Sequence, residues 1–199
     1  VTAQNNNYPP CLPYYEGVGP VVLGAHPAWP SSYFEGKMME VRIWNKVLSP
    51  AEIERTNLKQ ISGYENALEA YYPFDEGQGM VAADKVGGAN MLLNGLTWTK
   101  QEGRALELNN MDLRLKGGLF STSRNADFTY SMWFRIMEKA DSINLFNSNS
   151  LQLTLTPSDL RFVTISTETM TEHEPVVAHG TWMDQQWHFL AVTANHSTG

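Results

Sequence analysis

The stretch Phe128-Thr-Tyr-Ser-Met-Trp-Phe-Arg-Ile136 decides the fold of this chain. Every second residue, starting from Phe128, is aromatic or aliphatic, whereas the residues between them are Thr, Ser, Trp and Arg. An alternation with period two predicts a β-strand with one buried face and one mostly polar face. Similar segments recur along the chain, so we expect a protein built mainly of strands.

Short apolar segments separated by turn residues predict the other strands. Clusters of Asn, Ser, Pro and Asp lie between these segments and favour turns. Many short strands at this spacing are typical of a sandwich or barrel of antiparallel sheets. The expected strands are Pro20–Gly24, Lys37–Asn45, Leu68–Phe74, Met91–Trp98, Arg104–Leu108, Leu113–Lys116, Ile143–Asn147, Leu151–Thr156, Leu160–Ile165 and Trp187–Thr193.

One helix is expected after the second of these strands. Ser49-Pro50-Ala51-Glu52 combines a Ser N-cap, a Pro at the first helical position and a Glu three residues after the cap. We expect the helix to run to about Gln60 and to stop near Gly63. Because it is short and has few apolar residues, it is expected to cap a β core rather than to form one.

Composition excludes several classes of protein. The 199 residues carry 14 basic and 21 acidic side chains, a net charge of −7, which argues against nucleic-acid binding. The longest apolar runs are far shorter than a membrane span, and the polar start of the chain does not resemble a signal peptide. Cys11 stands alone, so an internal disulfide and a cysteine metal cluster are excluded. Residues 1–19 are expected to form a loop.

Several motifs resemble the laminin-G-like, concanavalin-A-like lectin/glucanase jelly-roll family. Residues 34–53 are similar to the closing strand of that family and the helix after it, and residues 68–79 are similar to its opening strand. The Asp- and Gly-rich stretch 82–90 follows as in the family, and residues 128–134 and 187–193 match its two central strands. The resemblance implies an all-β fold, an antiparallel jelly-roll β-sandwich with one short capping helix.

The order of these motifs leaves two domain organisations open. The closing-strand motif precedes the opening-strand motif, and the chain ends at 195–199 in a turn that should lead into another strand. One interpretation is a window over two domains: 1–62 is the end of one jelly roll, 63–67 is a linker, and 68–199 is the first two-thirds of a second one. The alternative is one permuted jelly roll over 20–199. The order of the strands and the final turn favour the window.

The expected function is recognition rather than catalysis. The chain has no Gly-x-Ser-x-Gly motif, no phosphate-binding loop and no His-Glu-x-x-His motif. It also lacks the Glu-x-Asp-x-x-Glu strand of the glucanase relatives, which supplies the paired carboxylates of a retaining glycosidase. The resemblance implies a non-catalytic adhesion or ligand-recognition module of a large secreted or cell-surface protein, whose partners are a glycan or protein ligand and the other domains of the same chain. The alternatives are a carbohydrate-binding module attached to a secreted hydrolase and a structural spacer in a repetitive stalk.

The loop 75–90 carries a calcium hypothesis. Asp75, Asp84 and Asn90 offer oxygen ligands among glycines, and Ca²⁺ takes six to eight oxygens. In relatives the ion also contacts an Asp of the closing strand; Met39 stands at that position here, with Glu40 next to it. Met39 shares parity with Val41 and Ile43 and is expected to be buried. The competing interpretation is that Asp84 caps a turn by bonding local N–H groups.

The aromatic and His residues complete the candidates. Trp44 and Trp133 lie on the strand faces opposite the aliphatic residues, where an exposed ring can stack on a sugar or anchor a protein. The competing interpretation is that each ring covers the helix or loop beside it. His173, Glu174, His179 and His188 match no metal-binding spacing and are expected on the surface or in loops.

Overall fold

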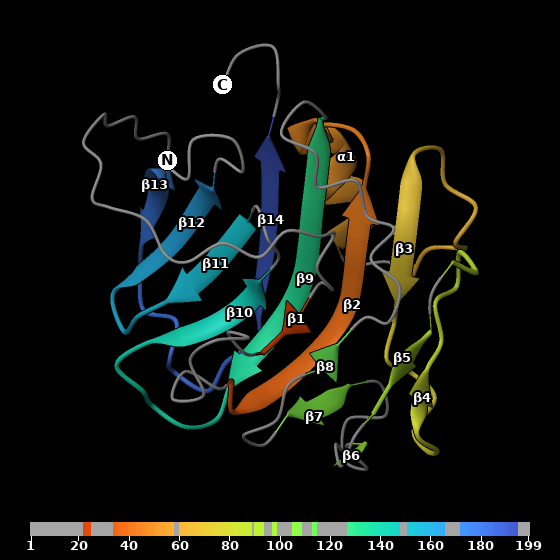
Figure 1. Cartoon of the computed structure of the whole chain (residues 1–199), viewed down its shortest axis with the longest axis horizontal. Coiled ribbons are helices and arrows are strands. Elements are labelled where there is room, and N and C mark those ends of the chain that lie inside the picture. Colours follow the sequence, from red (N-terminus) through yellow and green to blue (C-terminus); the bar gives the residue numbers. More distant parts are fainter. Residues whose placement is uncertain are drawn as a thin grey trace.

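The computed structural model describes residues 22–24, 34–57, 60–88, 90–93, 97–98, 105–108, 113–114, 127–147, 151–165 and 172–194. The strands form two antiparallel sheets that lie as layers of a sandwich (Figure 1). Sheet I has the order β13 (Glu172–His179), β12 (Asp159–Ile165), β11 (Leu151–Leu155), β10 (Ile143–Asn147), β1 (Val22–Leu23) and β8 (Leu113–Arg114). Sheet II has the order β14 (His188–Ala194), β9 (Phe128–Ile136), β2 (Gly36–Trp44), β7 (Leu106–Leu108) and β6 (Thr97–Trp98), and β3 (Leu68–Tyr72) also pairs with β2.

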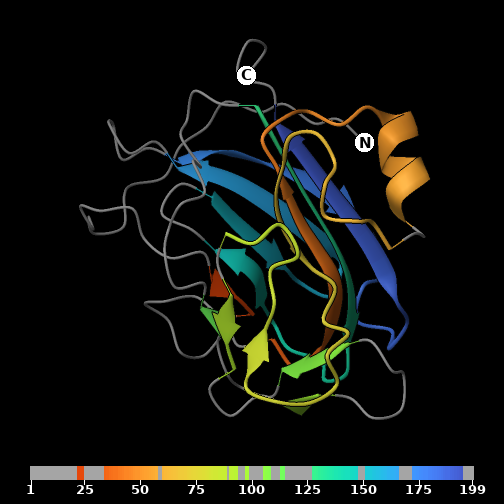
Figure 2. The ribbon, with the colours of Figure 1, turned by 90° about the vertical axis from the view of Figure 1, so that its right-hand side faces the viewer.

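The remaining elements lie outside these two layers. Strands β4 (Val81–Ala82) and β5 (Met91–Leu92) form a separate two-stranded ribbon. Helix α1 (Pro50–Asn57) lies on the outer side of sheet II, away from sheet I (Figure 2). Within the described residues, no helix is long and apolar enough to cross a membrane. The expected antiparallel β-sandwich with one short helix is confirmed.

The core lies between the two sheets and is built as the alternation in β9 predicts. Every second residue of β9, from Phe128 to Ile136, is apolar and belongs to the main buried cluster. The opposite face of β9 is also covered near its start, because Thr129 and Ser131 are buried. The Thr129 hydroxyl donates to the carbonyl of Lys46 and accepts from the N–H of Leu48. The segment that leads into α1 therefore crosses this polar face and satisfies it.

Strands from both predicted domain segments share the two sheets. Strand β2 pairs with β9 on one side and with β3 and β7 on the other, and β1 pairs with β8 and β10. The described strands of 22–44 and of 68–194 thus contribute to the same layers. The division into two domains with a linker at 63–67 and the alternative of one permuted unit over 20–199 both stay predictions.

A β-bulge in β2 corrects the prediction that Met39 is buried. The pairing of β2 with β9 shifts between Met39 and Arg42, and Glu40 adopts a left-handed φ of 56°. The extra residue reverses the two faces of the strand beyond it. Val41 and Ile43 therefore enter the core, whereas Met39 is only half-buried and lies opposite Trp133.

Two elements differ from the sequence predictions. His173, Glu174 and His179 lie in strand β13, which was not predicted; its Pro175 is tolerated because β13 is an edge strand. Strand β4 was not predicted either. Helix α1 is described from Pro50 to Asn57, and the next two positions of its predicted end, 58–59, lie outside the described residues. The loop expected at 1–19, Cys11 and the turn at 195–199 lie outside the described residues.

The start of α1 has the predicted capping box. The Ser49 N–H donates to the Glu52 carboxylate at 2.8 Å, and the Glu52 N–H donates to the Ser49 hydroxyl at 3.3 Å. Lys46 also donates to Glu52 at 2.8 Å. These hydrogen bonds, that of Lys46 first, lower the pKa of Glu52 to about 2. No residue of α1 is fully buried, and Ile53 packs partly buried against the cluster that contains Trp44 and Leu48.

We expect Ser49→Ala to lower the free energy of unfolding by about 1 kcal/mol, because the first turn loses its cap. Urea denaturation followed by circular dichroism measures the loss. Glu54→Ala on the exposed face of the same helix is the control and should change stability by less than about 0.5 kcal/mol. Equal effects of the two variants would contradict a role for the cap.

Candidate functional site

Asp84 is buried in the Gly-rich turn that follows β4. Its carboxylate accepts three backbone hydrogen bonds, from Tyr71 at 3.0 Å, Val86 at 3.0 Å and Gly88 at 2.9 Å. Gly87 supports the turn with a left-handed φ of 94°. Both carboxylate oxygens are therefore engaged, and they tie the turn to β3. These contacts are those of a turn cap.

The other three predicted calcium ligands have partners of their own. The Asn90 side-chain oxygen accepts from the Asp84 N–H at 3.0 Å, and Asp75 accepts from Gln60 at 2.8 Å. Glu40 accepts from Arg42 and from the Tyr71 hydroxyl. In the part of the chain that the structure describes, no three His, Cys, Asp or Glu side chains form a group that could hold a metal ion. The predicted ligands are thus engaged in hydrogen bonds within the protein, and calcium binding by this loop stays a prediction.

Glu76 is a carboxylate of this loop that sequence reasoning missed. One of its oxygens accepts from the Ala83 N–H at 2.7 Å. The other oxygen is buried and has no hydrogen-bond partner. The Asp-Glu-Gly triplet at 75–77 was the available signal in the sequence.

Arg42 is a buried cation that the sequence analysis did not single out. Only 1% of its surface is exposed, on the outer face of sheet II. Its guanidinium pairs with Glu40, donates to the carbonyl of Thr56 at 2.6 Å and lies 5.4 Å from the centre of the Tyr71 ring. Burial, then the nearby Glu40, raises the pKa of Tyr71, so its hydroxyl stays a neutral donor. Arg42 therefore joins β2, β3 and the last turn of α1.

Both predicted Trp residues cover neighbouring elements. Trp44 is 3% exposed and packs in a small second cluster with Leu48, Leu68 and Tyr71. Trp133 is half-buried, and its ring lies 5.4 Å from that of Phe189. The Trp133 indole N–H donates to the carbonyl of Asn57 at 2.7 Å, at the last residue of α1. These contacts fit the covering interpretation, and ligand binding by Trp44 and Trp133 stays a prediction.

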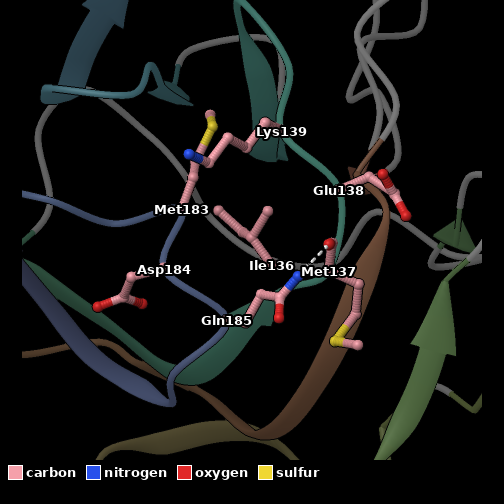
Figure 3. Close-up of a pocket in the computed structure, with 7 residues that line it drawn as sticks. All are labelled: Ile136, Met137, Glu138, Lys139, Met183, Asp184 and Gln185. Atoms are coloured by element: carbon pink, nitrogen blue, oxygen red, sulfur yellow. Dashed lines mark hydrogen bonds between the residues drawn. The ribbon is translucent and has the colours of Figure 1, made fainter.

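A shallow depression of about 210 Å³ (Figure 3) lies at the opposite end of sheet II from α1 (Figure 1). It is formed where β9 ends and where the connection from β13 to β14 passes. In Figure 3 the Ile136 side chain lies at its centre, with Met183 and Lys139 together on one side. The Gln185 amide donates across it to the carbonyl of Met137 at 3.3 Å. Its full lining is Ile136, Met137, Glu138, Lys139, Met183, Asp184 and Gln185.

The connection that forms one wall of this depression is held in place. Gln185 adopts a left-handed φ of 63°, a conformation that is uncommon for residues other than Gly. Asp184 pairs with His188 at 2.8 Å, and the His188 ring packs against Phe134 and Trp182. The hydrogen bond with His188, then that from the Gln186 N–H, lowers the pKa of Asp184, so the carboxylate is ionised at neutral pH. This site could not be predicted from local sequence patterns, because its two walls are separated by more than forty residues.

The comparison with protein families identifies the class of this chain. The model of the concanavalin A-like lectin/glucanases superfamily, laminin G type, matches residues 3–54 and 109–199. The match covers most of the chain, so the chain belongs to this superfamily. Membership of this superfamily supports a carbohydrate- or protein-binding module. No curated protein and no solved structure matches the chain at a significant level.

We expect Trp133→Phe to lower the free energy of unfolding by about 1 kcal/mol, because the carbonyl of Asn57 loses its donor while the ring packing stays. Trp98→Phe is the matched control. The Trp98 indole N–H donates to the carbonyl of Gly79 at an exposed position, so this variant should lower the free energy of unfolding by less. Urea denaturation measures both. If Trp133→Ala abolished binding on a glycan array while stability stayed unchanged, Trp133 would be a stacking platform rather than a covering residue.

Proposed function

We propose that this chain is a non-catalytic adhesion or ligand-recognition module of a large secreted or cell-surface protein. The depression between residues 136–139 and 183–185 is the observation that carries the proposal. Ile136 and Met183 give it an apolar floor, whereas Lys139, Gln185 and Asp184 offer charged and amide groups at its rim. An apolar floor with a few polar groups is the usual composition of a ligand site.

The size of the depression favours a small ligand group. Pockets for drug-sized molecules hold roughly 300–1,000 Å³, and this one is smaller. It suits one sugar ring of a glycan or one side chain of a protein ligand. Contacts outside the depression would then supply the rest of the affinity.

Asp184 supplies a negative charge at the rim of the depression. The hydrogen bond with His188, then that from the Gln186 N–H, lowers its pKa, so it does not suit the role of the protonated acid that a glycosidase needs. Asp184 therefore acts as a fixed negative charge and hydrogen-bond acceptor, which suits recognition.

The ligand proposal is tested by removing the polar rim. We expect Lys139→Ala combined with Gln185→Asn to weaken binding on a glycan array, or to a cell-surface protein ligand, by about tenfold, because two direct contacts are lost. Asn suits the left-handed backbone of residue 185, but its shorter side chain loses the contact. Arg55→Ala on α1 is the control and should bind like the unchanged protein. Release of reducing sugar from a bound glycan would contradict a non-catalytic module.

Calcium binding by the loop 75–90 stays a prediction with a thermal test. A bound ion stabilises a fold by about 2.7 kcal/mol at a hundredfold excess over its dissociation constant. We expect millimolar Ca²⁺ to raise Tm modestly, and EDTA or Asp84→Ala to remove the rise. The calcium-dependent increment is the readout, because Asp84→Ala also loses three backbone hydrogen bonds. Asp75→Ala shows whether the exposed carboxylate contributes, and an unchanged Tm of the unaltered protein would leave Asp84 as a turn cap alone.

A further inference from the structure

A second cavity, of about 190 Å³, lies between α1 and the segment that leads into β3. Its floor is apolar and buried, since Trp44 is 3% and Leu48 is 4% exposed. Thr56 and two charged residues of α1 form one wall, and Asn66 stands exposed on the other side. Because α1 lies at the opposite end of sheet II from the depression, this cavity is a separate site (Figure 1).

Trp44, on the floor of this cavity, carries a hydrogen-bond donor that the fold does not use. The indole nitrogen of Trp44 is buried, and no described residue accepts a hydrogen bond from it. The indoles of Trp133 and Trp98, by contrast, each donate to a backbone carbonyl. A buried N–H without an acceptor destabilises the folded chain. An acceptor that enters the cavity therefore gains more from this N–H than from an exposed one.

The charged side chains that line the cavity are two acids and two bases, so their charges cancel. They are Glu52, Glu65, Lys46 and Arg55. Glu52 accepts hydrogen bonds from Lys46 and from the N–H of Ser49. Glu65 accepts from two backbone N–H groups of its own loop. The cavity therefore has no excess charge to pair with an ion, and a neutral group with an acceptor suits it better.

We propose that this cavity binds the acetamido group of an N-acetylated sugar. Such a group is neutral and joins a methyl group to one carbonyl. The methyl group packs on Leu48 and the Trp44 ring, and the carbonyl oxygen accepts from the Trp44 indole. Trp44 thus recognises the sugar through the edge of its ring rather than by stacking on an exposed face. A site with a buried donor rejects a ligand that lacks the matching acceptor, so this second site selects the acetamido group.

The rim of the cavity favours a sugar over an acetylated lysine, which carries the same acetamido group. In a sugar, ring hydroxyls surround that group, whereas in an acetylated lysine it ends a chain of methylene groups. The exposed Asn66 and the half-buried Lys46 are polar side chains of the lining. Amide and ammonium groups hydrogen-bond to hydroxyls but gain nothing from a methylene chain.

The test is a titration of the isotope-labelled full chain with N-acetylglucosamine, followed by NMR. The indole resonance of Trp44 is identified as the one that is absent in Trp44→Phe. N-acetylglucosamine should shift this resonance. Glucose, which lacks the acetamido group, should bind about tenfold more weakly or worse, because the indole is left without its acceptor. Acetate should leave the resonance unchanged, because it is an ion.

Two variants separate recognition from a change in stability. Asn66→Ala removes a polar side chain from the rim, and we expect it to weaken N-acetylglucosamine binding about threefold at an unchanged Tm. Asn45→Ala is the matched control, because Asn45 is also exposed but does not line the cavity. Trp44→Phe should weaken binding about tenfold, measured from the amide resonances around the cavity at a temperature where circular dichroism shows the variant folded.

Four results would overturn the proposal. The first three are no shift of the Trp44 resonance with N-acetylglucosamine, an equal response to glucose, and tighter binding of an acetylated lysine. The fourth is a Trp44 shift that disappears in the combined variant Lys139→Ala and Gln185→Asn, because it would place the sugar in the depression. This last comparison also tells a failure of the present site from a failure of the ligand proposal for the depression.

Discussion

The buried guanidinium of Arg42 is the constraint on which the outer side of sheet II depends. A buried charge is costly unless it is paired and its donors are satisfied. Glu40 supplies the opposite charge, and the carbonyl of Thr56 accepts a further hydrogen bond. The same contacts hold the last turn of α1 against β2.

The bulge at Glu40 makes this arrangement compatible with a buried core. In a regular strand, Arg42 and Trp44 would share the face of Met38, which lies in the main cluster. The left-handed Glu40 reverses the faces, so Val41 and Ile43 enter the core and Arg42 faces outward. The cost of one unusual backbone conformation is therefore offset by keeping a charge out of the apolar interior.

Local sequence patterns predicted the elements whose stability is decided locally. The alternation of β9 and the Ser49–Glu52 box both correspond to observed structure. The bulge was not predicted, although the sequence carries a signal for it. That signal is that Met38 and Val41 are both apolar but differ in parity. The attachment of α1 to sheet II had no such signal: Arg42 and Trp133 donate to the carbonyls of Thr56 and Asn57 from strands that are distant in sequence. The Pro and the acidic residues in the sequence of β13 favour a loop, yet at the edge of a sheet they are compatible with a strand.

The candidate sites show the same division between local and tertiary information. Asp84 could be predicted as a turn cap because Asp and Gly residues alone favour such a turn. The depression could not be predicted from the sequence, since its floor comes from the end of β9 and its wall from the connection to β14. Membership of the superfamily leaves the position of a ligand open, because one fold supports binding sites at many places.

The connection between β13 and β14 forms one wall of the depression, and its contacts favour a rigid recognition surface. Gly180 donates to the carbonyl of Ser158 at 2.9 Å and lies so close to Trp182 that a Cβ atom there would be 2.8 Å from the ring. At the other end, Asp184 is bonded to His188, and Gln185 to Met137. A ligand that contacts this connection would not have to order it first, so less binding free energy is lost to conformational entropy. The left-handed backbone of Gln185 adds to this preorganisation, since the surrounding contacts hold its side-chain amide at the rim before a ligand binds.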